Sequence, residues 1–220
     1  MKPLSISIIG AGIGGLTAAL LLAKAGHHIH LLEQSSQISP VGAGIQLSPN
    51  CNRVLYQLGL GQLLEAKSFL PESIETRHWK GGQTINEIPL GHTCKQKYGF
   101  PYLNIHRADL ITILAEAVDQ QDNVELHLSS RVDSISSTAD SASLHIADPP
   151  GPQQHFSSDL LIGADGIHSI VREYLHGQAE PRFTGNIAWR MLVPSERIDA
   201  GLIKPKATAW WGPGAHFVHY

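Results

Sequence analysis

The first forty residues carry a hydrophobic pattern that predicts strand, turn, helix and strand in direct succession. Residues 4–9 are mostly apolar and predict a buried parallel strand, which a glycine-rich turn follows. Residues 16–25 form the longest apolar run of the chain and predict a helix. Residues 28–33 predict a second strand, which ends in an acidic residue. This order of elements is typical of a parallel α/β sheet.

Between residues 41 and 119 the hydrophobic period changes twice. Residues 41–47 predict a short strand, and Ser48-Pro49 predicts the start of a helix that ends at Gly59. From residue 73 apolar and polar positions alternate, and Gly81-Gly82 predicts a hairpin. The further elements predicted here are an irregular loop at 91–100, a strand at 102–105 and a helix at 107–119.

The second half of the chain is richer in strand patterns. Residues 159–162 predict a buried strand, and Ser169 is a candidate cap for a short helix after it. The other predicted elements are strands at 124–128, 131–136, 143–147, 187–193, 207–211 and 215–220, with a turn at 149–152. We therefore predict an α/β fold with two domains. The first, with the parallel sheet, comprises residues 1–72 and 100–178, and residues 73–99 and 179–220 form part of a β-rich domain.

Gly10, Gly12 and Gly15 stand in the spacing G-x-G-x-x-G between the predicted strand and helix. This spacing provides a tight turn, a close approach of a pyrophosphate to the backbone and close packing of helix on strand. The start of the helix adds unpaired N–H groups and the positive end of its dipole. Glu33 follows Gly15 by 18 positions, where a ribose-binding carboxylate stands in such sites. The sequence thus predicts a dinucleotide site, with a glycine-rich turn without ligand as the alternative.

Composition narrows the class of protein without identifying a reaction. The chain has 220 residues, 42% hydrophobic residues and a formal net charge of −3, which argues against a nucleic-acid-binding surface. The longest apolar run is too short to span a membrane, and no charged segment precedes it as in a signal peptide. Two cysteines and thirteen histidines show no metal-ligand spacing, so we predict no metal site. The pattern favours a cytoplasmic enzyme domain.

Four separated segments resemble one family. They are the glycine motif, residues 42–50 (GAGIQLSPN), residues 106–110 (HRADL) and residues 163–172 (GADGIHSIVR). In this order they resemble the single-component FAD-dependent aromatic hydroxylases of the salicylate hydroxylase and 3-hydroxybenzoate 6-hydroxylase type. The resemblance implies a Rossmann-like FAD-binding domain with a parallel sheet, and NADH or NADPH as a transient reductant. It also implies that a phenolic or aromatic acid substrate reacts with molecular oxygen through a flavin C4a-hydroperoxide.

The resemblance also implies residue roles. Glu33 would bind the adenosine ribose, Arg107 the ribityl and phosphate region, and Asp165 the ribityl–pyrophosphate part, while Val132 would lie beside the adenine. The full set of implied cofactor-binding residues is Gly10, Gly12, Gly14, Gly15, Glu33, Gln34, Ala43, Gly44, Arg107, Val132, Asp165 and Gly166. Plainer alternatives remain for three of them. Arg107 could be a surface residue at a helix start, Val132 sheet core, and Asp165-Gly166 a turn.

The last eleven residues, WWGPGAHFVHY, resemble the family's Gly-Pro-x-x-His-x-x-x-Tyr pattern. The resemblance implies that His216 deprotonates the substrate phenol and that Tyr220 orients it. A neutral imidazole is a suitable base near pH 7. On a strand the two residues would share a face and stand about 13 Å apart, at ~3.3 Å per residue, so they could flank an aromatic ring. The alternative is that both are ordinary strand residues.

A second flavin motif of the family, Gly-Asp-Ala-Ala-His, does not occur in these 220 residues. We therefore expect the chain to correspond to the N-terminal half or more of a hydroxylase, and to bind FAD weakly or not at all by itself. A separate C-terminal fragment or a homodimer would be the expected protein partner. The rival functions are an FAD-dependent epoxidase of the same fold and a non-catalytic or partner-dependent FAD-binding or dinucleotide-binding fragment. The substrate and the choice between NADH and NADPH are not predicted.

Overall fold

The computed structural model describes residues 2–38, 42–147, 155–178, 180–199, 201 and 203–220. The chain forms two compact units. The first comprises Met1–Pro40 and Ile111–Ala188, and the second Val41–Leu110 and Trp189–Tyr220. Residues 41–72 and 100–110, which the sequence places in the first domain, thus belong to the second compact unit. The predicted domain division stays a proposal.

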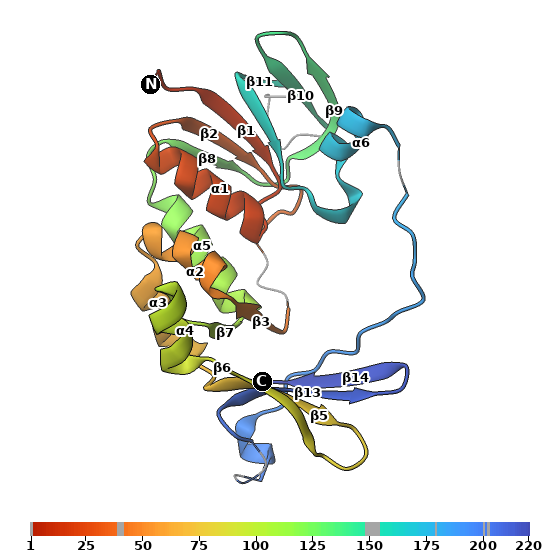
Figure 1. The fold of residues 1–220 in the computed structure, drawn as a ribbon. Helices are drawn as coiled ribbons and strands as arrows, with labels where there is room; N and C mark the ends of the chain where they lie inside the picture. Colours follow the sequence, from red (N-terminus) through yellow and green to blue (C-terminus); the bar gives the residue numbers. More distant parts are fainter. Residues whose placement is uncertain (1, 39–41, 148–154, 179, 200, 202) are drawn as a thin grey trace. The chain divides into compact units, whose positions relative to one another are not determined.

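A parallel sheet forms the centre of the first unit (Figure 1). Its strands are β1 (Ser5–Ile9), β2 (His28–Leu32), β8 (Val124–His127) and β12 (Leu160–Gly163), in the order β12-β1-β2-β8. Helix α1 (Ile13–Lys24) connects β1 to β2 and packs on both strands. The predicted strand–turn–helix–strand at the start of the chain is therefore present, and the predicted α/β class with a Rossmann-like parallel sheet is confirmed.

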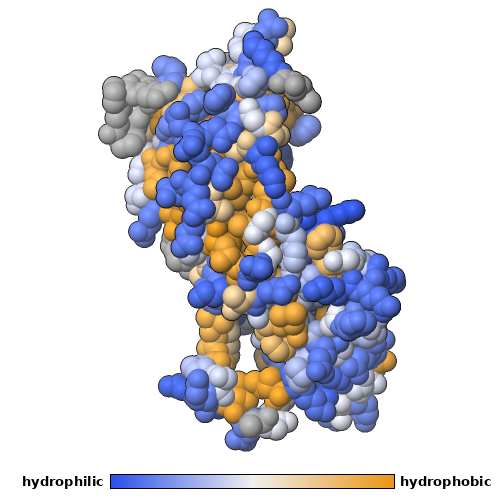
Figure 2. Space-filling view, turned by 90° about the vertical axis from the view of Figure 1, so that its left-hand side faces the viewer, coloured by the Kyte–Doolittle hydropathy of each residue, from blue (hydrophilic) through white to orange (hydrophobic). Residues whose placement is uncertain are grey.

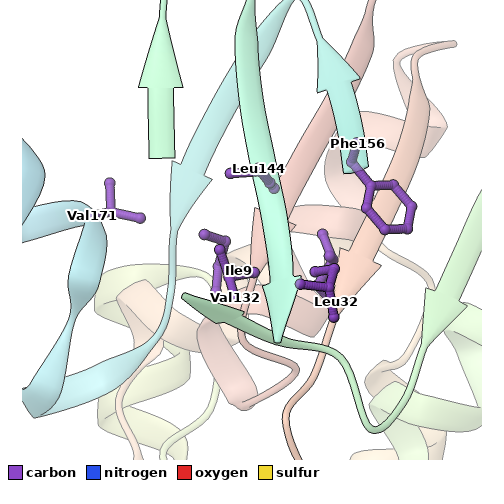
Figure 3. Close-up of a cluster of buried hydrophobic side chains, with 7 residues drawn as sticks. Ile9, Leu32, Val132, Leu144, Phe156 and Val171 are labelled. Atoms are coloured by element: carbon purple, nitrogen blue, oxygen red, sulfur yellow. The ribbon is translucent and has the colours of Figure 1, made fainter. Parts of the chain in front are cut away.

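A second, antiparallel sheet of the first unit consists of β9 (Arg131–Ser137), β10 (Ala142–Ala147) and β11 (His155–Ser158). Its apolar side chains meet those of β1 and β2 in one buried cluster (Figure 3). Ile9 and Leu32 pair in register in the parallel sheet, so their side chains leave the same face of it. The cluster consists of Ile9, Leu32, Val132, Leu144, Ile146, Phe156 and Val171. This packing fixes the ends of β1 and β2 beside the glycine turn.

The prediction of a buried strand at 159–162 is only half right. The segment forms β12, but its residues are half-buried or exposed, and Leu160 is 44% exposed. The reason is position, because β12 is an edge strand of the sheet that the described residues form. Beyond it, the short helix η1 (Gly166–His168) leads into α6 (Ile170–His176), as the candidate cap Ser169 predicts.

The second unit contains a four-stranded sheet in the order β14-β13-β5-β6. The predicted hairpin is present: β5 (Ser73–His78) pairs antiparallel with β6 (Thr84–Pro89). The two strands from the end of the chain, β13 (Lys206–Gly212) and β14 (Ala215–His219), pair with each other, and β13 runs parallel to β5. Segments more than a hundred residues apart in the sequence thus share one sheet, and the predicted β-rich portion is confirmed.

The rest of the second unit is a small sheet with helices around it. Strand β7 (Leu103–His106) lies between β3 (Gly44–Leu47) and β4 (Ser68–Phe69) and is antiparallel to both. The helices are α2 (Pro49–Gln57), α3 (Gly61–Lys67), α4 (Gly91–Tyr98) and α5 (Arg107–Asp119), the last of which ends within the first unit. The pairing of β3 with β7 positions the segment around Gly44.

Two predicted elements are wrong. Residues 91–100 are not an irregular loop: α4 forms there, buries Cys94 and ends at Gly99, whose φ of +79° suits a helix C-terminus. Residues 187–193 are not a strand, because their backbone pairs with no strand among the described residues, and Trp189 is 89% exposed. The predicted turn at 149–152 lies outside the described residues.

Trp189 is one of several large hydrophobic side chains that are exposed. Figure 2 shows hydrophobic residues at the surface among hydrophilic ones.

Candidate functional site

The glycine turn after β1 is held at both ends by neighbouring strands. The Gly10 amide donates a hydrogen bond to the Leu32 carbonyl (2.7 Å), and the Ala164 amide donates to the Ile9 carbonyl (2.8 Å). Gly10 has a φ of +99°, and a Cβ atom there would lie 2.5 Å from the Ala164 carbonyl oxygen. Only glycine combines this conformation with this close approach. The turn is therefore fixed by the sheet.

The start of α1 meets the geometric requirements of a phosphate site. Gly12 is the N-cap and carries no side chain, and the first turn of the helix holds no acidic residue. A Cβ atom at Gly12 or Gly14 would meet nothing within 4 Å, so there is free space beside the backbone at the start of the helix, where N–H groups have no partner within the helix. A Cβ atom at Gly15 would instead lie 1.8 Å from the Gly10 carbonyl oxygen. Gly15 thus allows the close packing predicted for it, and the group as a whole fits a pyrophosphate.

Glu33 follows β2 directly and braces the glycine turn. Its Oε2 atom accepts a hydrogen bond from the Ala11 amide (2.9 Å), and its Oε1 atom accepts one from the Ser35 amide (2.9 Å). A carboxylate offers about four acceptor sites, so two bonds leave room for ribose hydroxyls. The neighbouring Gln34 is exposed. The residues fit the predicted ribose contact, which remains a prediction.

Asp165 already has hydrogen-bond partners in its own segment. Its carboxylate accepts hydrogen bonds from the Ser169 hydroxyl (2.6 Å) and the Ile170 amide (2.8 Å), at the start of α6. Ser169 in turn accepts one from the Arg172 amide (3.0 Å), as predicted for a cap. Gly166 has a φ of +77°. Asp165-Gly166 therefore has a structural role in turning the chain, and the predicted contact of Asp165 with FAD remains a prediction.

Val132 lies on β9 with its side chain in the buried cluster shown in Figure 3. It is 6% exposed. The side chain is therefore core, as the alternative prediction had it, and only the backbone of this residue is left for a contact with adenine. The predicted adenine contact is still a prediction.

In the second unit the structure brings Arg107 and the glycine-rich segment before β3 together. The Arg107 amide donates a hydrogen bond to the Ala43 carbonyl (3.1 Å). A Cβ atom at Gly42 would lie 2.8 Å from the Cδ atom of Arg107. Gly44 pairs in register with His106. The segments 42–50 and 106–110, which carry the family resemblance, are thus spatial neighbours.

The ring of Tyr220 lies against Gly44. A Cβ atom at Gly44 would come within 2.6 Å of the Cε2 atom of Tyr220. Sequence reasoning missed Tyr102, whose hydroxyl donates a hydrogen bond to Gln46 Oε1 (3.1 Å). Burial raises the pKa of Tyr102, and Tyr220 adds to the rise. The antiparallel pairing of β3 with β7 is the signal that would have placed Tyr102 near Gln46.

His216 lies on β14, opposite Trp211 of β13, and its side chain is exposed. Alternation along the strand directs His216 and Val218 to one face and His219 to the other. By the same alternation Tyr220, one residue past the strand, continues the face of His216. His219 is half-buried, and burial followed by the charge of Arg77 lowers its pKa. The shared face of His216 and Tyr220 agrees with the predicted arrangement, but the roles of both remain predictions.

The opposite face of this sheet carries a buried charge network that sequence reasoning also missed. Glu75 accepts two hydrogen bonds from Arg77 (2.8 and 3.2 Å) and a third from Thr84 (2.7 Å). The Arg77 guanidinium lies 5.3 Å from the centre of the Trp210 ring, a cation–π contact. Trp210 therefore has a structural contact within the sheet.

The predicted cofactor-binding residues divide between the two compact units. Those of the glycine turn, with Glu33, Val132 and Asp165, belong to the first unit. Ala43, Gly44 and Arg107 belong to the second. Among the described residues no helix is both long and apolar enough to cross a membrane.

Comparison with known proteins identifies the family. Residues 4–196 match the FAD binding domain family. The chain is 38% identical to 3-amino-4-hydroxybenzoate 2-monooxygenase of Streptomyces cremeus over 219 residues, which are 100% of this chain and 54% of that protein. It is 35% identical to 3-hydroxybenzoate 6-hydroxylase of Polaromonas naphthalenivorans over 217 residues, 99% of this chain and 53% of that protein. The chain thus spans about half the length of the curated relatives that it matches.

Solved structures agree with these relatives. The structure of a variant of Klebsiella pneumoniae HpxO complexed with FAD matches with a TM-score of 0.76 and 25% identity, over 98% of this chain and 53% of that one. HpxO complexed with FAD and uric acid matches with a TM-score of 0.75 and 25% identity, over 98% and 52% of the two chains. The expected resemblance to FAD-dependent aromatic hydroxylases and the expected cofactor are confirmed at the level of the family. This chain belongs to the FAD binding domain family.

Proposed function

We propose that the protein containing this chain is a monooxygenase that uses FAD and NADH or NADPH to hydroxylate a phenol or aromatic acid. The observation that carries the proposal is the family match over residues 4–196, in which the glycine turn and Glu33 have the geometry of a dinucleotide site. The relatives named 3-amino-4-hydroxybenzoate 2-monooxygenase and 3-hydroxybenzoate 6-hydroxylase support the aromatic substrate class.

The chain's own residues would hold the cofactor by three kinds of contact. The N–H groups at the start of α1 would bind the pyrophosphate, helped by the helix dipole. Glu33 would accept hydrogen bonds from ribose hydroxyls, and Arg107 would pair with phosphate oxygens. When bound and reduced, FAD supplies the reaction with molecular oxygen. The rest of the site would position the substrate and exclude water.

His216 would act on the substrate. A neutral imidazole accepts the proton of a phenol, and the phenolate is a better nucleophile toward an electrophilic oxygen. Tyr220 would orient the ring, because it continues the face of the sheet that carries His216, and its own ring is placed by Gly44. Trp211, the register partner of His216, offers an apolar surface on the same face.

The first test is the absorbance spectrum of the purified chain, with the flavin identified after release and NAD(P)H oxidation measured with added FAD. The second is His216→Gln, with the exposed His176→Gln on α6 as the matched control. We expect His216→Gln to lower hydroxylation of a phenol at least ~100-fold while flavin reduction by NAD(P)H is retained. Unchanged turnover would remove His216 from the mechanism and favour an epoxidase or another non-phenolic reaction.

A second candidate, which the sequence already raises, is a partner-dependent FAD-binding fragment. In that case the chain alone binds FAD weakly and turns over no substrate. Adding the separately produced second half of one of these relatives would restore both properties. A stoichiometric bound flavin with NAD(P)H oxidase activity in the chain alone would exclude this candidate, and size-exclusion chromatography would show whether a homodimer is involved.

A further inference from the structure

Three ligand-type side chains converge on one face of the parallel sheet, at its β8 edge. His30 lies on β2, and Glu125 and His127 lie on the adjacent strand β8. His30 pairs in register with Glu125, and His127 pairs with Leu32, so all three side chains leave the sheet on the same side. The histidines are 97 positions apart in the sequence, so only strand pairing brings them together.

The distances within this group match a metal site better than a hydrogen-bonded cluster. His30 Nδ1 lies 3.4 Å from His127 Nε2 and 3.4 Å from Glu125 Oε2, and His127 Nε2 lies 3.6 Å from the same carboxylate oxygen. Good hydrogen bonds between such atoms measure about 2.7–3.2 Å. In a tetrahedral zinc site with bonds of about 2.0–2.1 Å, neighbouring ligand atoms stand about 3.3–3.4 Å apart. The three atoms are thus arranged like one face of a tetrahedron.

The surroundings fix the histidines and leave the group accessible. The ring of Phe156 lies edge-on to His127, with centroids 4.7 Å apart, and 5.6 Å from the ring of His30. Both histidine side chains are about three-quarters buried, at 24% and 23% exposed, which restricts their rotamers before any ion binds. Glu125 is 67% exposed, so an ion can enter from solvent and keep a water molecule as its fourth ligand.

The ligand types select the class of ion. Two imidazole nitrogens and one carboxylate oxygen suit a divalent transition-metal ion of intermediate softness, whereas Ca²⁺ and Mg²⁺ prefer oxygen ligands throughout. Among the described residues this is the one group of three such side chains whose ligand atoms all approach within 4.8 Å of one another. The family match and the proposed monooxygenase chemistry assign it no role.

We propose that His30, Glu125 and His127 bind one Zn²⁺-class ion and that this ion cross-links β2 to the edge strand β8. The three residues belong to the first unit, whereas the proposed substrate residues belong to the second. The site is adjacent to the cofactor-binding carboxylate through the backbone, because the Glu33 amide donates a hydrogen bond to the His127 carbonyl (2.9 Å). An ion at this place would hold the end of β8 against β2.

The test is isothermal titration of the tag-free 220-residue chain with ZnCl₂. We expect saturable binding of one ion, and a rise of the thermal unfolding midpoint on addition of Zn²⁺ but not of Mg²⁺. His127→Gln and Glu125→Gln should each weaken Zn²⁺ binding at least ~10-fold. Glu125→Gln is the safer variant, because its exposed side chain contributes little to folding.

The matched control is His28→Gln, which removes an exposed histidine from the same strand without touching the group. It should bind Zn²⁺ as tightly as the wild-type chain. With Co²⁺ in place of Zn²⁺, the wild type should give the visible absorption of a tetrahedral centre, and Glu125→Gln should lose it. Zn²⁺ binding of equal strength in the wild type, His127→Gln and Glu125→Gln would overturn the proposal, as would the absence of one-to-one binding to the wild type.

Discussion

Replacing Gly15 by alanine tests whether the helix and the glycine turn pack as closely as the structure shows. The added Cβ atom would lie 1.8 Å from the Gly10 carbonyl oxygen and 3.0 Å from its carbon. Backbone cannot rotate away as a side chain can. To accept the methyl group, the start of α1 must move from the turn by about 1 Å or more, against the packing of α1 on β1 and β2.

The size of the effect follows from two opposing terms. Overpacking of a well-packed site costs about 1–3 kcal/mol, whereas alanine in place of a helical glycine gains about 1 kcal/mol of helix propensity. Because the contact is with backbone, we expect an overpacking cost at the upper end of this range, and a net loss of about 1–2 kcal/mol in the free energy of unfolding. Gly14→Ala is the matched control. A Cβ atom there meets nothing within 4 Å, so only the propensity gain remains and stability should rise by up to ~1 kcal/mol.

The assay is urea unfolding followed by circular dichroism and by tryptophan fluorescence. All four tryptophans belong to the second unit, so their fluorescence reports on that unit alone. The dichroism reports on the helices of both units, including α1 of the first. Gly15→Ala should lower the midpoint seen by dichroism and leave the fluorescence midpoint nearly unchanged. If Gly15→Ala is as stable as Gly14→Ala, the close packing of α1 on the turn is wrong.

Three further changes test contacts of the fold and the site. The two hydrogen bonds from Arg77 hold the pKa of the Glu75 carboxyl below its usual value against the opposing effect of burial. Their stabilisation is therefore present above about pH 4.3 and lost as the pH falls through the lower pKa of the folded state. Glu75→Gln should lower the free energy of unfolding by about 1–3 kcal/mol at neutral pH. Urea titrations at several pH values should show that the variant loses less stability toward acid pH than the wild type. An equal loss in both would contradict the prediction. In Gly44→Ala the new Cβ atom would lie 2.6 Å from the ring of Tyr220, so the ring should move and the near-ultraviolet dichroism should change. An unaltered spectrum would refute the contact. Ser169→Ala should lower the free energy of unfolding by about 1 kcal/mol, because the Arg172 amide loses its hydrogen bond to the Ser169 side chain. Ser169→Asn should retain most of this stabilisation, because asparagine is also a favourable N-cap residue.

The start of the chain could be predicted from its sequence because its signals are local. The apolar run of β1, the glycine spacing and the apolar helix α1 each identify one element, and short connections leave few topologies. The same holds for the β5–β6 hairpin at Gly81-Gly82. Glu33 could be predicted as well, because a ribose-binding carboxylate stands at a characteristic number of positions after the glycine motif.

The errors concern features that tertiary context decides. The helix α4 has few apolar residues and two lysines in its last turn, so its sequence carries no strong helical period, and burial of Cys94 anchors it. Residues 187–193 have a strand-like composition but no pairing partner among the described residues. The contacts of Glu75 with Thr84 and of Arg77 with Trp210, and the convergence of His30 with His127, depend on strand register, which sequence spacing does not contain.

The division of the proposed FAD contacts between two compact units has a consequence for stability. A ligand that binds only the folded state raises the free energy of unfolding by RT ln(1 + [L]/Kd), and it does so for every part that must be folded to bind it. If Glu33 of the first unit and Arg107 of the second both hold one FAD, added FAD should raise the dichroism and fluorescence midpoints together. If only the glycine turn and Glu33 contact it, the dichroism midpoint should rise and the tryptophan signal should not follow. The comparison therefore decides whether residues of the second unit, which include Ala43, Gly44 and Arg107, contribute to binding of the cofactor.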